Sequence, residues 1–94
     1  MTKKLYTSMP ERVAGVIWKQ GELTSRQLKK MYGIGSPSKE VQRLRERGVP
    51  VYSIITKDKH GKRVTKYRIS FDFDREVVAT AYQANPQIFI LRED

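Results

Sequence analysis

The fold is decided by residues 24–48, which read TSRQLKKMYGIGSPSKEVQRLRERG. Two helix starts lie within this stretch. Thr24 and Gln27 have the spacing of a capping box, in which each side chain accepts a hydrogen bond from the backbone N–H of the other residue. Ser36 is a residue type that caps helices, and Pro37 suits the first helical position, where its fixed φ favours the helix. The stretch therefore predicts two short, consecutive helices.

The turn between these two helices is predicted from its glycines. The first helix has Leu28, Met31 and Tyr32 as its apolar positions. It ends at Gly33, because glycine readily takes the left-handed conformation found after many helices. Ile34 stands between two glycines, and we expect its side chain to plug the core.

The second helix is expected to have one buried and one exposed face. At about 100° per residue, Pro37, Val41 and Leu44 fall on the side that faces the core. Arg45 lies at the edge of this buried stripe, where we expect it to pack or pair within the fold. Gly48 closes the helix. The opposite face carries Ser38, Lys39, Gln42, Arg43 and Glu46.

A further helix precedes this stretch. Ser8 and Glu11 have the spacing of another capping box, and Gly21 is the expected end of the helix. The apolar stripe of this helix consists of Ala14, Ile17 and Trp18, with Val13 beside it.

After Pro50 the sequence pattern changes from helical to extended. Residues 51–56 are mostly β-branched or aromatic, although their pattern does not select a buried face. Residues 65–71 alternate, and the loop at 57–63 contains Gly61, so the two segments predict a β-hairpin. We expect the alternating residues of one face to pack in the core rather than to stack on bases. They are Thr65, Tyr67, Ile69 and Phe71.

Residues 8–70 are predicted to form one domain that includes the hairpin. Residues 71–94 are predicted to form a C-terminal helix and a short extended tail. Asp72 or Asp74 can cap a last helix, which ends at Asn85. The apolar residues of that helix are Val77, Val78, Ala81 and Tyr82. An apolar run, Ile88–Leu91, comes after it. Two roles remain open for residues 74–91: a homodimer interface, or folding back onto the domain's own core.

Charge is distributed unevenly along the chain. The whole sequence has 19 Lys+Arg and 10 Asp+Glu, a net charge of +9. Residues 1–70 hold 17 basic and 5 acidic residues, a balance of +12, whereas residues 71–94 hold 2 and 5, a balance of −3. A strongly basic body implies an anionic partner: duplex DNA, RNA or an anionic membrane surface.

Several function classes are disfavoured by composition. The absence of cysteine excludes a disulfide framework, a thiol nucleophile and a zinc finger. His60 is the only histidine and lacks carboxylate partners for a metal site. No paired carboxylates, nucleophile–base set or phosphate loop is visible, so we expect neither an enzyme nor a cofactor. No apolar run approaches the roughly 20 residues of a membrane span, and we expect a cytoplasmic protein with no membrane partner.

Helix, helix, turn, helix and hairpin is the order of a winged helix-turn-helix domain. Residues 17–69 also resemble a family of small winged helix-turn-helix domains common in phage and prophage genes. The matching motifs are Gly21, Leu23-Thr24-Ser25, Gly33-Ile34, Leu44-Arg45-Glu46-Arg47-Gly48, Pro50 and Tyr67-Arg68-Ile69. The resemblance implies an α+β fold with three helices and a β-hairpin wing. It also implies a duplex-DNA partner and, for a phage protein, the cytoplasm of a bacterial host.

Three groups of residues are candidates for DNA contact. Arg and Lys can donate to guanine O6 and N7, and Gln can pair with adenine, so the outward face of the third helix suits base edges in the major groove. That group comprises Ser36, Ser38, Lys39, Gln42 and Arg43. A basic wing suits phosphates or the minor groove, and its residues are Lys57, Lys59, His60, Lys62 and Arg63. Ser25 and Arg26 open the second helix, where a phosphate can bind.

Each group also has a purely structural interpretation. A solvated helix face, a charged hairpin tip and an ordinary helix cap would show the same residue types. The leading hypothesis is nevertheless a sequence-specific DNA-binding protein that regulates transcription or another DNA transaction. One alternative is an interaction module that docks on a host polymerase or repair factor, suggested by the acidic, apolar tail. The other is a protein that coats DNA or RNA without sequence preference.

Overall fold

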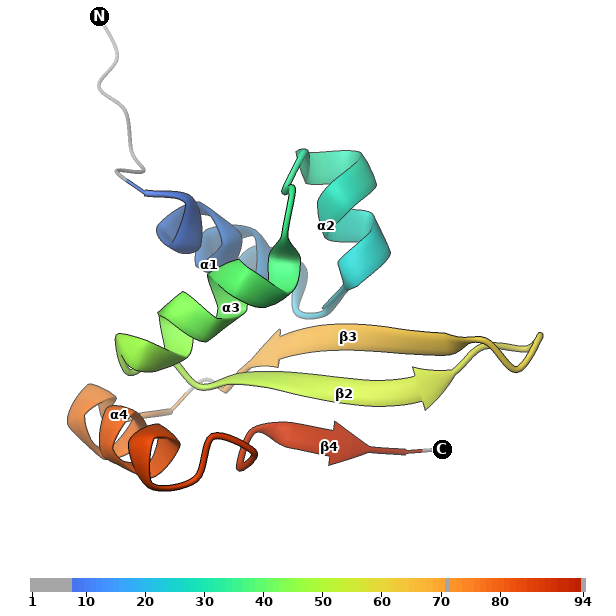
Figure 1. The fold of residues 1–94 in the computed structure, drawn as a ribbon. Coiled ribbons are helices and arrows are strands. Elements are labelled where there is room, and N and C mark those ends of the chain that lie inside the picture. Colours follow the sequence, from blue (N-terminus) through green and yellow to red (C-terminus); the bar gives the residue numbers. More distant parts are fainter. Residues whose placement is uncertain (1–7, 71, 94) are drawn as a thin grey trace, which may run out of the picture.

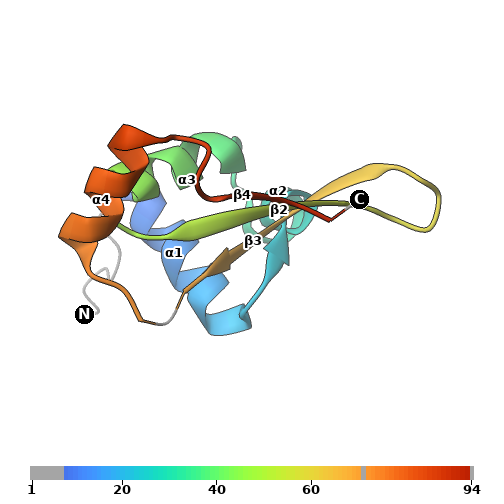
Figure 2. The same cartoon turned by 90° about the horizontal axis from the view of Figure 1, so that it is seen from below.

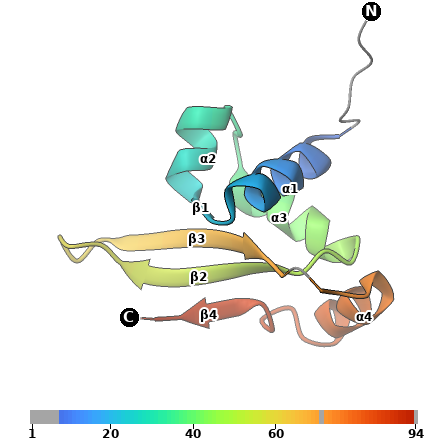
Figure 3. The ribbon, with the colours of Figure 1, turned by 180° about the vertical axis from the view of Figure 1, so that it is seen from behind.

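The structure, a computed structural model, describes residues 8–70 and 72–93. Its architecture is α+β, with helices α1, α2 and α3 on one face of a mixed sheet (Figures 1 and 3). The predicted strand residue Phe71 lies outside the described residues. In chain order, the elements are α1 (Met9–Gln20), β1 (Leu23–Thr24), α2 (Ser25–Tyr32), α3 (Pro37–Glu46), β2 (Val51–Lys57), β3 (Arg63–Ile69), α4 (Arg75–Ala84) and β4 (Ile90–Arg92).

The sheet has the strand order β1-β3-β2-β4. The predicted hairpin is present as β2 and β3, which are antiparallel from the pair Val51↔Ile69 to the pair Lys57↔Arg63. Two strands were not expected from the sequence. β1 pairs antiparallel with β3, and β4 pairs parallel with β2. The hairpin loop extends well beyond the helices, as Figure 2 shows from below.

Most of the predicted helix ends are confirmed. Thr24 and Gln27 form the reciprocal capping box, with distances of 3.0 Å and 2.8 Å between each backbone nitrogen and side-chain oxygen. Gly33 follows α2 in the left-handed conformation, with φ of 68°. Asp74 rather than Asp72 caps α4, because its Oδ1 accepts from two backbone N–H groups of the first turn. The cap predicted at Ser36 is wrong in one respect: its side chain makes no capping hydrogen bond.

The core lies between the helices and the sheet. Ile34 plugs it as predicted and is 1% exposed. For two residues the prediction of a place on the apolar, core-facing stripe is wrong. Trp18 is 46% exposed and Met31 is 66% exposed. The buried stripe of α1 runs instead through Pro10, Val13 and Ile17, and Leu28 is the buried residue of α2. The core cluster is formed by Val13, Ile17, Leu23, Leu28, Ile34, Val41, Leu44, Val49, Val51, Tyr67 and Ile69.

The C-terminal segment packs against the rest of the fold. α4 contacts α3, and the pairing of β4 with β2 places Leu91 opposite Ile54. Val78 and Phe89 are buried, which confirms that the segment folds back onto its own chain. β4 therefore covers the middle of β2, from Ser53 to Ile55, and Val51, Ser53 and Ile54 are all buried. Alternation places Ile54 on the opposite side of the sheet from the other two.

Candidate nucleic-acid interface

α3 has the two faces that its sequence predicted. Pro37, Val41 and Leu44 are buried against the core. The predicted DNA-contact residues of this helix are all exposed, namely four side chains expected to read bases and Ser36 before them. No other element of the described chain buries them. They are Ser36, Ser38, Lys39, Gln42 and Arg43. A helix held from one side only can enter a groove with its other side.

The predicted wing is exposed, but its turn is shorter than the expected loop at 57–63, because Lys57 ends β2 and pairs with Arg63 at the start of β3. All five of its predicted contact residues are exposed: Lys57, Lys59, His60, Lys62 and Arg63. Asp58, which the sequence analysis did not single out, organises the turn. Its Oδ1 accepts hydrogen bonds from the backbone N–H groups of His60 and Lys62, each at 2.9 Å, and its backbone N–H donates to the Lys62 carbonyl. The available signal was an Asp three residues before Gly61, a common turn pattern.

We expect the two replacements Asp58→Ala and Asp58→Asn to separate the order of the wing from its charge. Both remove one negative charge, but asparagine keeps an oxygen that can accept from the two amides. Amide hydrogen exchange at His60 and Lys62 should accelerate in Asp58→Ala and remain near the original rate in Asp58→Asn. The loss of stability should be about 1 kcal/mol or less, since the turn is exposed. Equal exchange rates in the two variants would show that Asp58 does not order the wing.

A groove of about 520 Å³ separates the start of α2 from the base of the wing. Its lining contains four basic side chains, which are those of Arg26, Lys29, Lys62 and Arg63. Asp58 is the single acidic residue in the lining. The tertiary structure thus brings together the predicted helix start and two of the predicted wing residues. The lining does not include the α3 residues. The sequence analysis missed Lys29, although its three-residue spacing from Arg26 places both on one side of a helix.

Ser25, a predicted phosphate contact, is half-buried rather than exposed. Its side chain lies close to Tyr67, which is 3% exposed. The expectation that Tyr67 packs in the core is confirmed. Arg26 is exposed, so the start of α2 offers this guanidinium and the backbone more readily than the Ser25 hydroxyl.

Burial raises the pKa of Tyr67 above its usual value of 10.0. The neutral ring therefore contributes stability that is fully present below pH 10 and is lost as the pH rises from there through the pKa of the folded state. We expect the unfolding free energy of the original protein to fall above pH 10 more steeply than that of Tyr67→Phe. Urea denaturation at several values from pH 8 to pH 11 tests this. Parallel pH profiles would contradict it.

Arg45 serves the fold, as its place at the edge of the buried stripe predicted. Its Nε donates to the Val51 carbonyl at 2.8 Å, and one of its terminal nitrogens donates to Ser53 Oγ at 2.7 Å. The guanidinium carbon also lies 5.8 Å from the centre of the Phe89 ring. Burial lowers the pKa of Arg45 below its usual range. This side chain joins α3 to β2 and to the segment before β4, and it is turned away from the exposed face.

No protein-family model, curated protein or solved structure matches the chain. Within residues 8–70 and 72–93, no group of three or more His, Asp or Glu side chains is placed to hold a metal ion. None of the helices described there has the length and apolar character needed to cross a membrane. The candidate site consists of exposed basic and polar side chains on α3, the wing and the start of α2.

Proposed function

We propose that this protein is a winged helix-turn-helix protein that reads the sequence of duplex DNA. The order of the elements supports the fold. α2 and α3 are joined by a short Gly-Ile-Gly turn, and the β2–β3 hairpin follows α3 directly. In this fold the second helix of the pair enters the major groove.

One observation carries the functional proposal: the outer face of α3 is uncovered and bears groups that can read bases. Lys39 and Arg43 supply donors that match guanine, and the Gln42 amide can both donate to and accept from adenine. Glutamine adds nothing to general attraction for a polyanion, so its place on this face favours base reading over simple coating.

Two basic regions supply the sequence-independent part of binding. The wing presents Lys59 and His60 in its turn and Lys57 at the end of β2, and the groove beside α2 is lined by further basic side chains. Contacts of this kind set the position of the protein on the duplex and make affinity depend on salt. Substitutions there should weaken binding to all sequences alike.

The test is fluorescence anisotropy on a pool of random 30-mer duplexes from low to high salt, followed by sequencing of the bound fraction. A steep salt dependence with an enriched sequence is the expected result. A steep salt dependence without enrichment would indicate a coating protein, and equal competition by RNA would point to general nucleic-acid binding. Negligible binding at low salt would refute the proposal.

A regulator of transcription or of another DNA transaction is the biological role that we propose for such a reader. The phage-type assignment rests on the motif resemblance alone. Because the proposed partner is DNA, we place the protein in the cytoplasm, which for a phage product is that of the bacterial host. Genome-wide mapping of bound sites beside genes whose expression changes on deletion would test the regulatory role.

Homodimer formation or contact with a host protein is a second candidate function, for the C-terminal segment. It is favoured by three apolar side chains that stay exposed after the segment has folded back. Val77 is 65% exposed, Ile88 is 45% and Leu91 is 40%. Light scattering at high concentration tests the homodimer, which would let two copies read half-sites one DNA turn apart. A monomer that also recovers no stoichiometric protein partner would rule out both forms.

A further inference from the structure

Glu40 is an unexpected residue to find on a helix that approaches DNA. Its side chain is only 13% exposed, and its Oε1 is fully buried without a hydrogen-bond partner among the described residues. A carboxylate held this way is costly unless a cation lies nearby. The nearest one is Arg43, whose terminal nitrogen NH1 is 3.7 Å from Glu40 Oε1.

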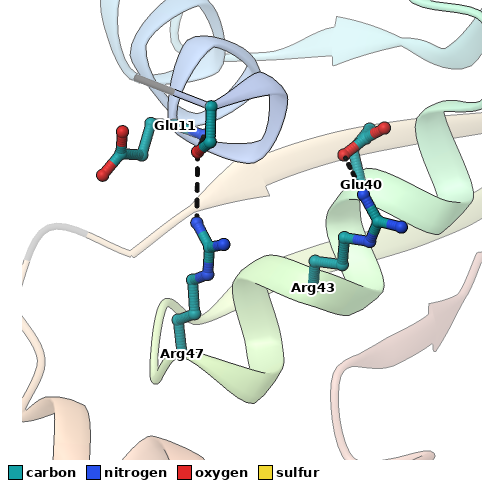
Figure 4. Close-up of polar contacts among 5 residues, drawn as sticks. Glu11, Glu40, Arg43 and Arg47 are labelled. Atoms are coloured by element: carbon teal, nitrogen blue, oxygen red, sulfur yellow. Dashed lines mark hydrogen bonds and ion pairs between the residues drawn. The ribbon is translucent and has the colours of Figure 1, made fainter. Parts of the chain in front are cut away.

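Figure 4 shows Glu40 and Arg43 next to each other on the edge of α3 that faces the start of α1. Arg47 lies one turn further along the same edge, where it donates to Ser8 Oγ at 3.2 Å. The Arg47 guanidinium therefore already has a hydrogen-bond partner within the fold. The Arg43 side chain is 47% exposed, and Glu40 is its only ion-pair partner among the described residues.

We propose that Glu40 is a positioning residue that directs Arg43 towards a base edge and away from neighbouring phosphates. The proposal rests on the function proposed above. A free arginine has four rotatable torsions and binds a phosphate as readily as a guanine. An adjacent carboxylate restricts those torsions, and it repels a phosphate that approaches the same guanidinium. A neutral base edge meets no such repulsion, so Glu40 lowers general affinity and raises sequence discrimination.

The variant Glu40→Gln removes the charge and keeps the shape of the side chain. We expect its affinity for random duplex to rise roughly two- to fivefold, as for the loss of one exposed ion-pair partner. Discrimination should fall by a similar factor at the one base position that Arg43 contacts, and other positions should be unchanged. The readout is the binding of a preferred duplex and of all its single-base variants.

Glu46→Gln is the matched control. It changes net charge by the same amount on the same helix, but Glu46 is exposed and not paired with Arg43. It should raise affinity for every duplex equally. If Glu40→Gln also acts equally on every duplex, the positioning role is excluded. The role is excluded as well if Glu40→Gln still lowers discrimination in an Arg43→Ala background, where there is no arginine to direct.

A measurement without DNA separates this inference from the proposed function. The ¹⁵N order parameter of the Arg43 Nε–Hε group reports how strongly that side chain is restricted. It should fall in Glu40→Gln and stay constant in Glu46→Gln, with melting temperatures confirming that both variants fold. An unchanged order parameter would overturn the positioning role whatever the protein binds. Failure to find any preferred duplex would instead refute the DNA-reading function.

Discussion

A variant with both Lys39→Ala and Gln42→Ala is expected to lose most of its affinity for the preferred duplex. Each base contact contributes about 1–3 kcal/mol of discrimination. Two lost contacts therefore correspond to roughly a thirtyfold to twenty-thousandfold weaker binding. Binding to random duplex should weaken far less, because only one charge is removed. The slope of log affinity against log salt concentration should decrease in magnitude by about one.

The chain offers a matched control for this variant at the end of α1. Lys19 and Gln20 are also exposed and are replaced by the same chemistry, but they lie outside α3, the wing and the groove. Lys19→Ala/Gln20→Ala should leave discrimination between preferred and random duplex intact. Anisotropy titrations of both duplexes with both variants provide the comparison. Equal losses on the two duplexes for the α3 variant would indicate that this face contacts phosphates only.

The replacement Gly48→Ala is expected to produce the largest loss of stability. Gly48 has a φ of 88°, and a Cβ added to it would lie 2.8 Å from the Arg75 Cα and closer still to the Arg75 carbonyl oxygen. The left-handed conformation costs about 1–2 kcal/mol for alanine. Displacing the backbone at the start of α4 adds about 1–3 kcal/mol, as overpacking generally does. The expected loss is therefore about 2–5 kcal/mol.

Gly21→Ala separates these two contributions. Gly21 has the same φ of 88°, but nothing lies within 4 Å of the position that a Cβ would take. Its backbone has φ of 88° and ψ of −49°, outside the regions that alanine favours, so its replacement should lower the unfolding free energy by the backbone cost alone, about 1–3 kcal/mol. Urea denaturation of the two variants gives the difference directly. If both variants lose the same amount, the close approach of Arg75 to Gly48 adds no steric cost to the replacement.

The candidate nucleic-acid interface shows most clearly which features the sequence could predict and which it could not. The periodicity of α3 identified its exposed face, because buried and exposed positions repeat with the helical turn. The same reasoning could not find the organising role of Asp58, and it did not join Arg26 and Lys29 to the base of the wing. Those relations depend on how a helix and a hairpin that are distant in sequence meet in space.

What the sequence determined by itself was the set of local structures. Thr24 with Gln27 starts a helix and Gly33 ends it, since each of these signals acts on backbone groups within a few residues. For the last helix the sequence left two candidate caps, Asp72 and Asp74. The alternation of Tyr67 and Ile69 likewise defined the buried face of their strand, but Thr65, predicted on the same face, is only half-buried and lines the groove beside α2.

Only the tertiary structure decided where these elements meet. It paired β4 with β2, left Trp18 exposed and gave Arg45 its partners on β2 and at Phe89. An apolar run such as Ile88–Leu91 is compatible with an edge strand or with an interface between copies. The choice depends on whether a free strand edge elsewhere in the chain lies within reach. That condition is set by the packing of α4 against α3, a long-range contact that no local pattern encodes.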